Sequence, residues 1–236
     1  MNILILGATS AIARVTALEF AAQGHNLYLA SRDSDELARI TTDLSSRFPI
    51  NVQYGQFDAE DFTAHAAFLL RVIAAMEKLD GVLLAFGDMK DAQPVEIINR
   101  NLTGAISILG YCSEYFIAQK SGFIIGISSV AGDRGRRKNK IYGAAKAGLS
   151  TYLQALRNEL FFHGIRVITI KPGFVDTPMT YGLKGMFCVA KPEYVGKRIV
   201  ASINKLSDIV YLPWFWRYIM LIIKWMPEWL FKRVRW

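Results

Sequence analysis

The sequence predicts a single α/β domain built on a parallel β-sheet that helices cover on both faces. Short apolar runs rich in β-branched residues alternate with longer helical stretches, which is the pattern of such a sheet. The length of 236 residues suits one large core better than two full domains. The chain shows no internal repeat, so residues 1–236 are expected to form one domain.

The predicted strands are short and evenly spread. Two of the helices between them end at a glycine: Gly24 follows a helix over about 11–23, and Gly164 closes the helix that contains Tyr142. Both glycines are expected to have a positive φ, as at many helix ends. The strands are predicted at about 2–7, 26–31, 51–57, 80–86, 122–128, 165–171 and 208–212.

Composition and charge exclude several classes of protein. Hydrophobic residues make up 52% and charged residues 20%, which is incompatible with wholesale disorder. The net charge of +8 comes from two local segments, 133–140 and 209–236, so a nucleic-acid-binding protein is not expected. Cys112 and Cys188 lack the spacing of a metal site or a disulfide scaffold, and no metal is expected. A first strand that starts at Asn2 leaves no room for a signal peptide, so a cytoplasmic protein, peripheral at the membrane, is expected.

The turn after the first strand is a candidate phosphate-binding site. The segment 7–13, Gly-Ala-Thr-Ser-Ala-Ile-Ala, joins a predicted strand to a predicted helix. Backbone N–H groups at a helix start can receive a pyrophosphate if the residues are small, as Ala11 and Ala13 are. An ordinary strand-to-helix turn is the alternative.

The end of the second strand is the position that selects the cofactor. Ser31 and Arg32 lie about 20 residues beyond the glycine turn, where such folds meet the adenosine ribose. An arginine beside a hydroxyl can hold the 2′-phosphate of NADP, so NADP(H) is favoured and NAD(H) stays possible. Asp33 is interpreted as the N-cap of the next helix. Asp58 either accepts from the adenine amino group or caps a helix.

Tyr142 and Lys146 are four residues apart on a predicted helix, so both side chains leave the same face. An ammonium group beside a phenol favours the phenolate and makes the tyrosine a better acid. Ser129 ends the fifth strand at the edge of the sheet where ligands bind, although it could instead cap a turn. Asn101 either holds a water that links Lys146 to solvent or bonds its own helix. His25, His65 and His163 show no partner spacing.

In order and spacing, the chain resembles the short-chain dehydrogenase/reductases along nearly its whole length. The residues that carry the resemblance are Gly7-x-x-x-Ala11-x-Ala13, Asp58, Asn101, Ser129, Tyr142-x-x-x-Lys146 and Lys171-Pro172-Gly173-x-Val175-x-Thr177.

The resemblance implies a doubly wound, Rossmann-like sheet of about seven strands in the order 3-2-1-4-5-6-7. It implies that Tyr142 is the general acid/base, Ser129 orients the carbonyl, Lys146 also holds the nicotinamide ribose, and Asn101 supports a proton relay. Two departures are alanines in place of the later glycines and Leu-Ala-Phe-Gly at 84–87 in place of Asn-Asn-Ala-Gly. The expected nucleotide contacts, besides Tyr142 and Lys146, are Gly7, Thr9, Ser10, Ala11, Ile12, Ser31, Arg32, Asp58, Ala59, Ala85, Gly87, Pro172, Gly173, Val175 and Thr177.

A basic loop precedes the predicted catalytic helix. Arg134, Arg136 and Arg137 lie between Ser129 and Tyr142, where guanidinium groups can clamp a phosphate of the substrate. A solvated basic loop is the alternative. The segment at about 172–190 is rich in glycine, proline and threonine, and it is interpreted as a substrate loop or lid.

The tail at about 213–236 holds all five tryptophans, mixed with arginine and lysine. Aromatic and basic residues together suit a lipid headgroup interface. Prolines and cations at Pro213, Arg217, Lys224 and Pro227 argue against a membrane span. A dimer interface or a cover for the substrate pocket is the alternative.

These features favour an NAD(P)H-dependent ketoreductase that acts on a phosphorylated, lipid-linked keto sugar. Segments 132–137, 171–179 and 213–227 resemble the branch of the family that reduces polyprenylphosphoryl-2-keto-pentoses, which implies a flavin-dependent oxidase partner. Reduction of a 3-keto lipid or another small ketone is one alternative. A non-catalytic NADP-binding redox sensor or scaffold is another. A homo-oligomer is expected.

Overall fold

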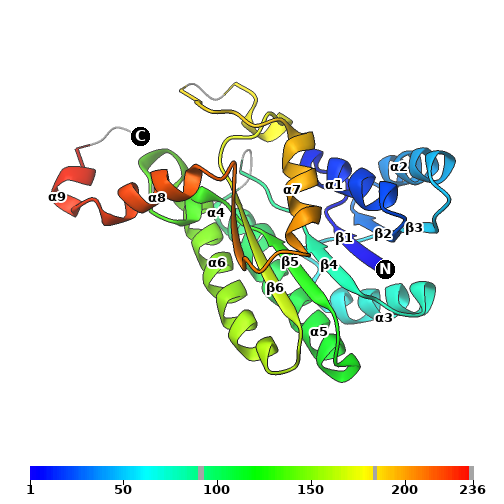
Figure 1. Cartoon of the computed structure of the whole chain (residues 1–236). Coiled ribbons are helices and arrows are strands. Elements are labelled where there is room, and N and C mark those ends of the chain that lie inside the picture. The colour runs from blue at the N-terminus through cyan, green and yellow to red at the C-terminus, as the bar shows by residue number, and fades with distance from the viewer. Residues whose placement is uncertain (90–92, 183–184, 234–236) are drawn as a thin grey trace.

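The computed structural model describes residues 1–89, 93–182 and 185–233. Seven parallel strands form one sheet in the order β3-β2-β1-β4-β5-β6-β7, as expected from the sequence (Figure 1). Each observed strand lies within two residues of its predicted ends. The strands are β1 (Asn2–Leu6), β2 (Asn26–Ser31), β3 (Val52–Gln56), β4 (Gly81–Leu84), β5 (Phe123–Ile127), β6 (Arg166–Pro172) and β7 (Ile209–Leu212).

Helices cover both faces of the sheet because successive strand residues point to opposite sides. Ile3 and Ile5 pack with α1, α2 and α7, whereas Leu4 and Leu6 pack with α3, α5 and α6. The two apolar clusters make one continuous three-layer domain. The helices are α1 (Ala11–Ala22), α2 (Ser34–Arg47), α3 (His65–Met76), α4 (Pro94–Ile98), α5 (Gly104–Gln119), α6 (Lys140–Phe161), α7 (Pro192–Ser202), α8 (Trp216–Trp225) and α9 (Glu228–Phe231).

Local signals fix several helix ends. Ser10 accepts a hydrogen bond from Ala13 N at 3.3 Å and caps α1, while Asp33 accepts from Glu36 N at 3.0 Å and caps α2. The predicted cap role of Asp33 is thereby confirmed. Gly24 and Gly164 follow α1 and α6 with φ of +76° and +72°, as predicted.

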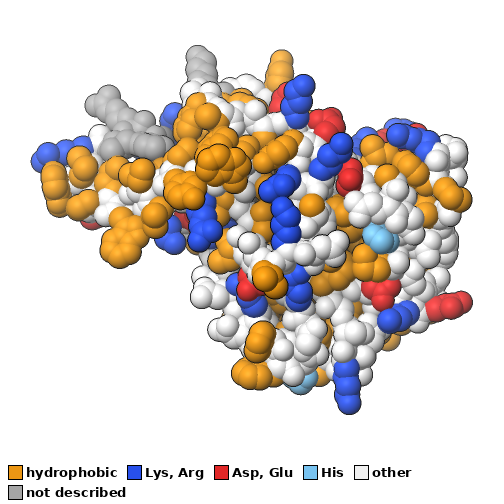
Figure 2. All heavy atoms as spheres, viewed as in Figure 1, with side chains coloured by type: hydrophobic (Ala, Val, Ile, Leu, Met, Phe, Trp, Pro, Cys, Tyr) orange, Lys and Arg blue, Asp and Glu red, His pale blue; other side chains and the backbone are white. Residues whose placement is uncertain are grey.

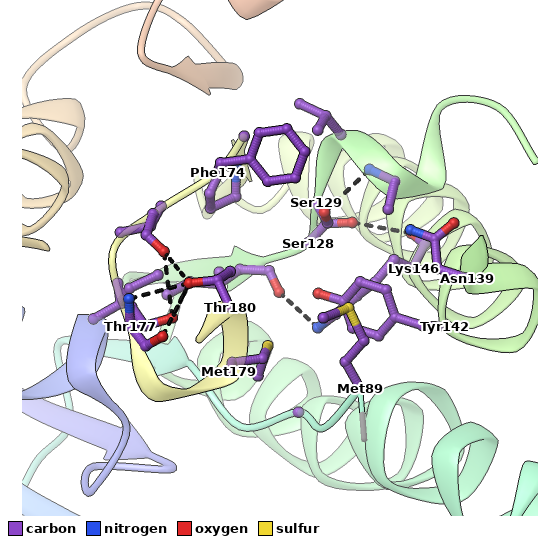
Figure 3. Close-up of a pocket in the computed structure, with 18 of the residues that line it drawn as sticks. Met89, Ser128, Ser129, Asn139, Tyr142, Lys146, Phe174, Thr177, Met179 and Thr180 are labelled. Atoms are coloured by element: carbon purple, nitrogen blue, oxygen red, sulfur yellow. Dashed lines mark hydrogen bonds between the residues drawn. The ribbon is translucent and has the colours of Figure 1, made fainter. Parts of the chain in front are cut away.

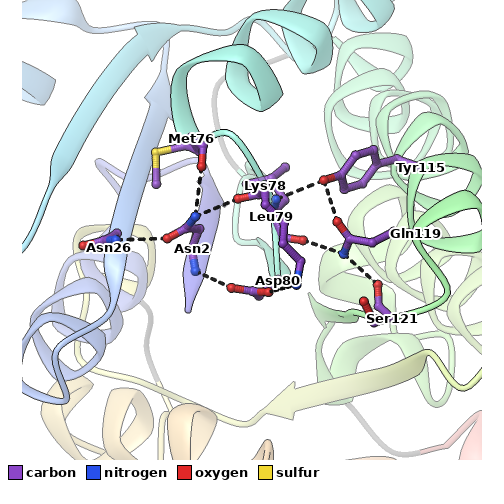
Figure 4. A network of polar contacts seen from close by, with 9 residues as sticks. All are labelled: Asn2, Asn26, Met76, Lys78, Leu79, Asp80, Tyr115, Gln119 and Ser121. Carbon is purple, nitrogen blue, oxygen red and sulfur yellow. Dashed lines mark hydrogen bonds and ion pairs between the residues drawn. The ribbon is translucent and has the colours of Figure 1, made fainter.

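A polar network ties the strands together at their amino ends (Figure 4). Asn2 donates from its backbone to Asp80 at 2.8 Å and from its side chain to the carbonyls of Met76 and Lys78, both at 2.9 Å. Nearby, Gln119 donates to Leu79 O at 2.8 Å. These bonds hold the edge of the sheet that lies opposite the carboxyl ends of the strands, so they stabilise the fold without facing a ligand site.

The tail forms the two short helices α8 and α9 at one end of the molecule (Figure 1). Within the described residues, no helix is long and apolar enough to cross a bilayer. Arg235 and Trp236, which belong to the predicted basic aromatic tail, lie outside the described residues.

Candidate active site

Two adjoining cavities open at the carboxyl ends of the strands. The larger has a volume of about 1060 Å³ and reaches from the start of α1 to Tyr142 and the segment after β6. The smaller, of about 190 Å³, lies between the ends of β1, β2 and β3. Four residues line both cavities, so the two form one continuous trough. The shared residues are Thr9, Ser10, Phe86 and Gly87.

Tyr142 and Lys146 lie one helical turn apart on α6 and both line the larger cavity (Figure 3). Lys146 Nζ stands 5.7 Å from the centroid of the Tyr142 ring and donates to Ile127 O at 3.1 Å. Lys146 is 3% exposed, so its ammonium group sits in the protein interior beside the phenol. The structure therefore brings together the two residues that the sequence pairs.

Burial shifts the pKa values of Lys146 and Tyr142 in opposite directions. It lowers the pKa of Lys146 to about 8, because the interior disfavours the ammonium form. It raises the pKa of Tyr142 to about 12, because the interior disfavours the phenolate. A hydrogen bond with Ser129 works against this rise and favours the phenolate. The expectation that Tyr142 has a lowered pKa is therefore wrong for this structure, because burial outweighs the hydrogen bond with Ser129, and Tyr142 is a phenol at neutral pH.

Ser129 has the turn-cap role that the sequence offered as an alternative, and it also lines the larger cavity. Its hydroxyl accepts from Ala131 N at 3.0 Å and caps a short 3-10 turn, and it also bonds the Tyr142 hydroxyl. The neighbouring Ser128 turns the other way and donates to Lys146 O at 3.0 Å. Ser128 therefore holds α6 against β5, whereas Ser129 faces the larger cavity.

Asn101 lies in a π-helical turn, Asn99–Thr103, between α4 and α5. Its amide donates to Ile97 O at 2.9 Å and to Asp88 O at 2.7 Å, so it does bond its own helix. Its oxygen Oδ1 is buried and has no hydrogen-bond partner among the described residues. A Cβ added to Gly87 would stand 2.5 Å from that oxygen and 3.0 Å from Lys146 Nζ, so the two polar atoms converge on one point.

The residues predicted to hold the nucleotide all line one cavity or the other. Most of them face the larger cavity, where small residues at the start of α1 leave the N–H groups accessible. The larger cavity holds Thr9, Ser10, Ala11, Ile12, Ala85, Gly87, Tyr142, Lys146, Pro172, Gly173, Val175 and Thr177, and the smaller holds Gly7, Ser31, Arg32, Asp58 and Ala59.

The smaller cavity is polar at the end of β2. Ser31 and Thr9 share a hydrogen bond of 2.8 Å between their hydroxyls, and Arg32 lines the cavity beside them. Asp58 accepts from Glu60 N at 3.0 Å in a local turn, and α3 starts later, at His65. The helix-cap alternative for Asp58 is therefore wrong, and the carboxylate lies at the cavity wall.

The loop after β6 closes the larger cavity from the opposite side. Thr180 holds it in shape, because its hydroxyl donates to Val175 O at 2.6 Å and accepts from Thr177 N at 3.2 Å (Figure 3). An isolated bridge between Val175 and Ala190 joins the two ends of the loop. The predicted substrate loop thus carries its own turn structure. Residues 183 and 184 lie outside the described part.

The three arginines of the basic loop have three different places. Arg136 lines the larger cavity, and its Nη2 donates to Met220 Sδ at 3.2 Å. Burial lowers its pKa, while the charge of Asp133 raises it. Arg137 is exposed and is not among the cavity residues. Lys138 and Lys140 line the cavity in its place, so the sequence identified the loop but not all of its cations.

The role of phosphate clamp that the sequence predicts for Arg134 is wrong. Its Nη1 donates to the carbonyls of Ile223 at 2.7 Å and Lys224 at 3.1 Å, and its Nη2 pairs with Glu228 at 2.8 Å. The guanidinium also stacks on Phe231, 4.1 Å from the ring centroid. Free carbonyls at the end of a helix attract a fork of donors, so Arg134 binds the tail and not a ligand.

The cavity also has apolar walls that the sequence did not single out. Most of their residues come from loops, and Ile97 and Ile141 come from α4 and α6, so no single local pattern marks them as lining. Figure 3 shows Met89, Phe174 and Met179 in the same cavity as Tyr142. The wall residues are Met89, Ile97, Ile141, Phe174, Met179, Met186 and Phe187.

The trough fits a nicotinamide dinucleotide. It runs from a hydroxyl and arginine end at Arg32, past the start of α1, to the phenol of Tyr142. Among the described residues, no group of three or more His, Cys, Asp or Glu side chains is placed to hold a metal ion. The fold and the site together define an NAD(P)-dependent oxidoreductase.

Comparison with known proteins agrees with this class. A family model described as short chain dehydrogenase matches residues 1–185. An uncharacterized oxidoreductase of Streptomyces coelicolor is 33% identical over 242 residues, which cover 99% of this chain and 95% of the relative. The chain belongs to the short-chain dehydrogenase/reductase family.

Solved structures share the fold at low sequence identity. A short-chain type dehydrogenase/reductase from Mycobacterium ulcerans matches with a TM-score of 0.81 at 19% identity, over 89% of this chain and 87% of the other. The NADPH-dependent 3-quinuclidinone reductase from Rhodotorula rubra matches with a TM-score of 0.80, also at 19% identity, over 89% and 88%.

Proposed function

We propose that the protein uses NADPH to reduce a ketone on an amphiphile that carries a phosphate group. The observation that carries the proposal is the composition of the larger cavity. The phenol of Tyr142 shares this cavity with the cations Arg136 and Lys138 and with an apolar wall that includes Phe174 and Met179. Cations match a phosphate, and the apolar wall matches a hydrocarbon chain.

The chain's own residues supply the proton chemistry. A bound nicotinamide supplies the hydride that the carbonyl carbon receives, and the Tyr142 hydroxyl gives its proton to the carbonyl oxygen, which yields a secondary alcohol. Ser129 holds that oxygen by a hydrogen bond. Lys146 favours the phenolate that remains, and a water between its ammonium and Asn101 Oδ1 would return the proton.

Two features support NADPH over NADH. Arg32 lies at the ribose end of the trough beside the bonded hydroxyls of Ser31 and Thr9. Asp33, the next residue in the chain, caps α2 with its carboxylate and does not line the cavity. An arginine beside two hydroxyls favours the 2′-phosphate, and the carboxylate of Asp58 lies at the β3 side of the same cavity. The structurally similar reductase from Rhodotorula rubra is NADPH-dependent by its title.

For the substrate we propose a polyprenylphosphoryl-2-keto-pentose. The loop at 132–137, the segment at 171–179 and the pattern around Arg217 and Pro227 resemble decaprenylphosphoryl-2-keto-ribose reductase. That enzyme is the ketoreductase half of a two-enzyme epimerase, so a flavin-dependent oxidase partner would supply the ketone. Phe174 and Arg136, from two of these segments, both line the larger cavity, which supports the assignment.

The test is a coupled spectrophotometric assay with the purified protein. NADPH consumption with a polyprenylphosphoryl-2-keto-pentose is expected, together with the matching pentose alcohol as product. The same keto sugar without its phosphate should react with a much higher KM. If only uncharged ketolipids are reduced, the substrate assignment is wrong while the reductase assignment stands.

A further inference from the structure

Helix α8 is apolar on two of its faces. Trp216, Met220 and Ile223 follow one another at the four- and three-residue spacing of a helix face, and all three are buried. A second stripe with the same kind of spacing lies on another face and is exposed. A helix that packs on a domain normally has one apolar stripe and a polar remainder.

The buried stripe fixes α8 against the active site. Trp216 is fully buried and packs its ring 5.2 Å from that of Phe187 and 5.6 Å from that of Phe174, two residues that line the larger cavity. A Cβ on Gly173 would stand 1.9 Å from Trp216 Nε1, so only glycine permits this approach. The helix is therefore a fixed neighbour of the cavity and not a loose tail.

The exposed stripe continues into α9 as a large apolar surface. Ile222 is 68% exposed and Trp225 is 81% exposed. Figure 2 shows hydrophobic side chains gathered over this end of the molecule, with lysine and arginine at its margin. We call this surface the tail face. It consists of Trp214, Tyr218, Leu221, Ile222, Trp225, Trp229 and Leu230.

The charge around the tail face is positive. Arg217 and Lys224, seven residues apart and both exposed, lie on one side of α8. Lys232 and Arg233 follow α9. Glu228 is the acidic residue of the described tail, and Arg134 neutralises it at 2.8 Å. The surface thus joins exposed tryptophans to cations that no carboxylate of the tail balances.

We propose that the tail face docks on an anionic lipid bilayer. Tryptophan and tyrosine favour the headgroup region, and flanking cations are attracted to anionic lipids. A second copy of the chain fits less well, because a two-fold contact would bring the cations of one tail face against those of the other. This proposal does not depend on the proposed substrate, since docking concerns the surface and not the reaction.

Docking also places the cavity at the bilayer. Arg134 joins the basic loop to the end of α8, and the next residues of that loop, including Arg136 and Lys138, line the cavity. A membrane-resident substrate would therefore meet the cavity without leaving the headgroup region.

The test is flotation of the full chain with vesicles of phosphatidylcholine, with and without phosphatidylglycerol. Binding is expected to the vesicles with phosphatidylglycerol and to weaken as salt is added. Replacing Ile222 and Trp225 with serine should abolish it. The matched control is F161S/F162S, since Phe161 and Phe162 are 73% and 86% exposed at the far end of α6. Retained NADPH binding verifies that each variant is folded.

A second pair of variants tests the charges. Arg217→Gln with Lys224→Gln should weaken binding by about 30-fold, because each cation near an anionic surface contributes about 1 kcal/mol and 1.4 kcal/mol is a factor of ten. The control pair is Lys120→Gln with Lys205→Gln, two exposed lysines outside the tail. Equal loss in both pairs would contradict the proposal. Vesicle binding that survives in I222S/W225S would also contradict it. A third contradicting result would be a parent chain that binds no vesicles and is a dimer, which I222S/W225S converts to a monomer.

Discussion

Lys146 Nζ lies 5.7 Å from the centroid of the Tyr142 ring, within a pocket that leaves the lysine 3% exposed. This relationship places a buried cation beside a phenol that bonds Ser129. It also explains why the two pKa values move in opposite directions, since burial disfavours the charged form of each group. The proposed chemistry of the site depends on this pair.

Tyr142→Phe should lower kcat by about 10²- to 10⁴-fold, because the proton donor to the carbonyl oxygen is lost. NADPH binding should be retained, as measured by nucleotide fluorescence. Tyr152→Phe is the matched control, since Tyr152 lies on the same helix and its hydroxyl donates to Ile106 O at 3.3 Å, away from the cavity. Full turnover in the Tyr142 variant would exclude its role as general acid.

Arg32→Ala should raise the KM for NADPH by about 10- to 150-fold, because a hydrogen bond to a charged group contributes about 1.5–3 kcal/mol. The KM for NADH should stay the same, since NADH has no 2′-phosphate. Steady-state kinetics with NADPH and with NADH measures the two KM values in the parent and the variant. Arg39→Ala, an exposed arginine that pairs with Glu36 on α2, is the control. An equal rise for both cofactors would contradict the contact.

Arg136→Ala should raise the KM for the phosphorylated ketone by about tenfold or more, because a charged donor facing the phosphate is removed. The KM for NADPH should not change. Arg137→Ala serves as the control, since Arg137 is a neighbour of the same type that lies outside the cavity. Similar effects from both substitutions would assign the effect to the net charge of the loop.

Lys146→Met should change how stability depends on pH. The pKa of Lys146 falls from 10.5 to about 8 on folding, so the unfolded chain binds more protons between these values and stability rises with pH there. Relative to the variant, the parent should gain about 3 kcal/mol of unfolding free energy from pH 8 to 10.5. Urea unfolding across this range measures the difference. Lys140→Met replaces an exposed lysine of the same helix and keeps Lys146, so this variant should show the same pH dependence as the parent.

Arg134→Lys should loosen the tail, because an ammonium group cannot reproduce the fork that reaches Ile223, Lys224 and Glu228. Trypsin cleavage after Lys224 should become about tenfold faster or more, since each lost bond of a charged donor contributes about 1.5–3 kcal/mol. Trypsin cleavage at other sites and NADPH binding should be the same as in the parent, which verifies that only the tail has changed. The Arg137→Lys variant should be cleaved at the same rate as the parent. Equal cleavage rates in the parent, Arg134→Lys and Arg137→Lys would show that Arg134 does not hold the tail.

The sheet and the nucleotide half of the site were predictable because local patterns determine them. Apolar runs mark the strands, and a strand that ends just before Gly7 or at Ser31 brings that residue to the carboxyl edge of the sheet. The same holds for Tyr142 and Lys146, whose spacing puts them on one helix face. These positions need no knowledge of distant contacts.

The substrate side was predictable only in part, because its residues are positioned by contacts far along the chain. Arg134, Arg136 and Arg137 look alike in the sequence. Arg134 turns to carbonyls about ninety residues away, at the end of α8, and Arg137 stays in solvent. The lining role of Phe174 and Phe187 likewise depends on Trp216, which belongs to another element. Side-chain direction in a loop is a tertiary property.

The basic loop is held at its start through two neighbouring residues. Asp133 pairs with Lys171 of β6 and accepts from the Tyr211 hydroxyl at 2.8 Å, and Arg134 is held by the tail. At its other end the loop enters α6 at Lys140. Residues 135–139 lie between these two fixed points, and Arg136 among them contacts Met220 of α8. We expect that exchanging these five residues changes which substrate the cavity accepts, while the sheet that carries the loop stays as it is.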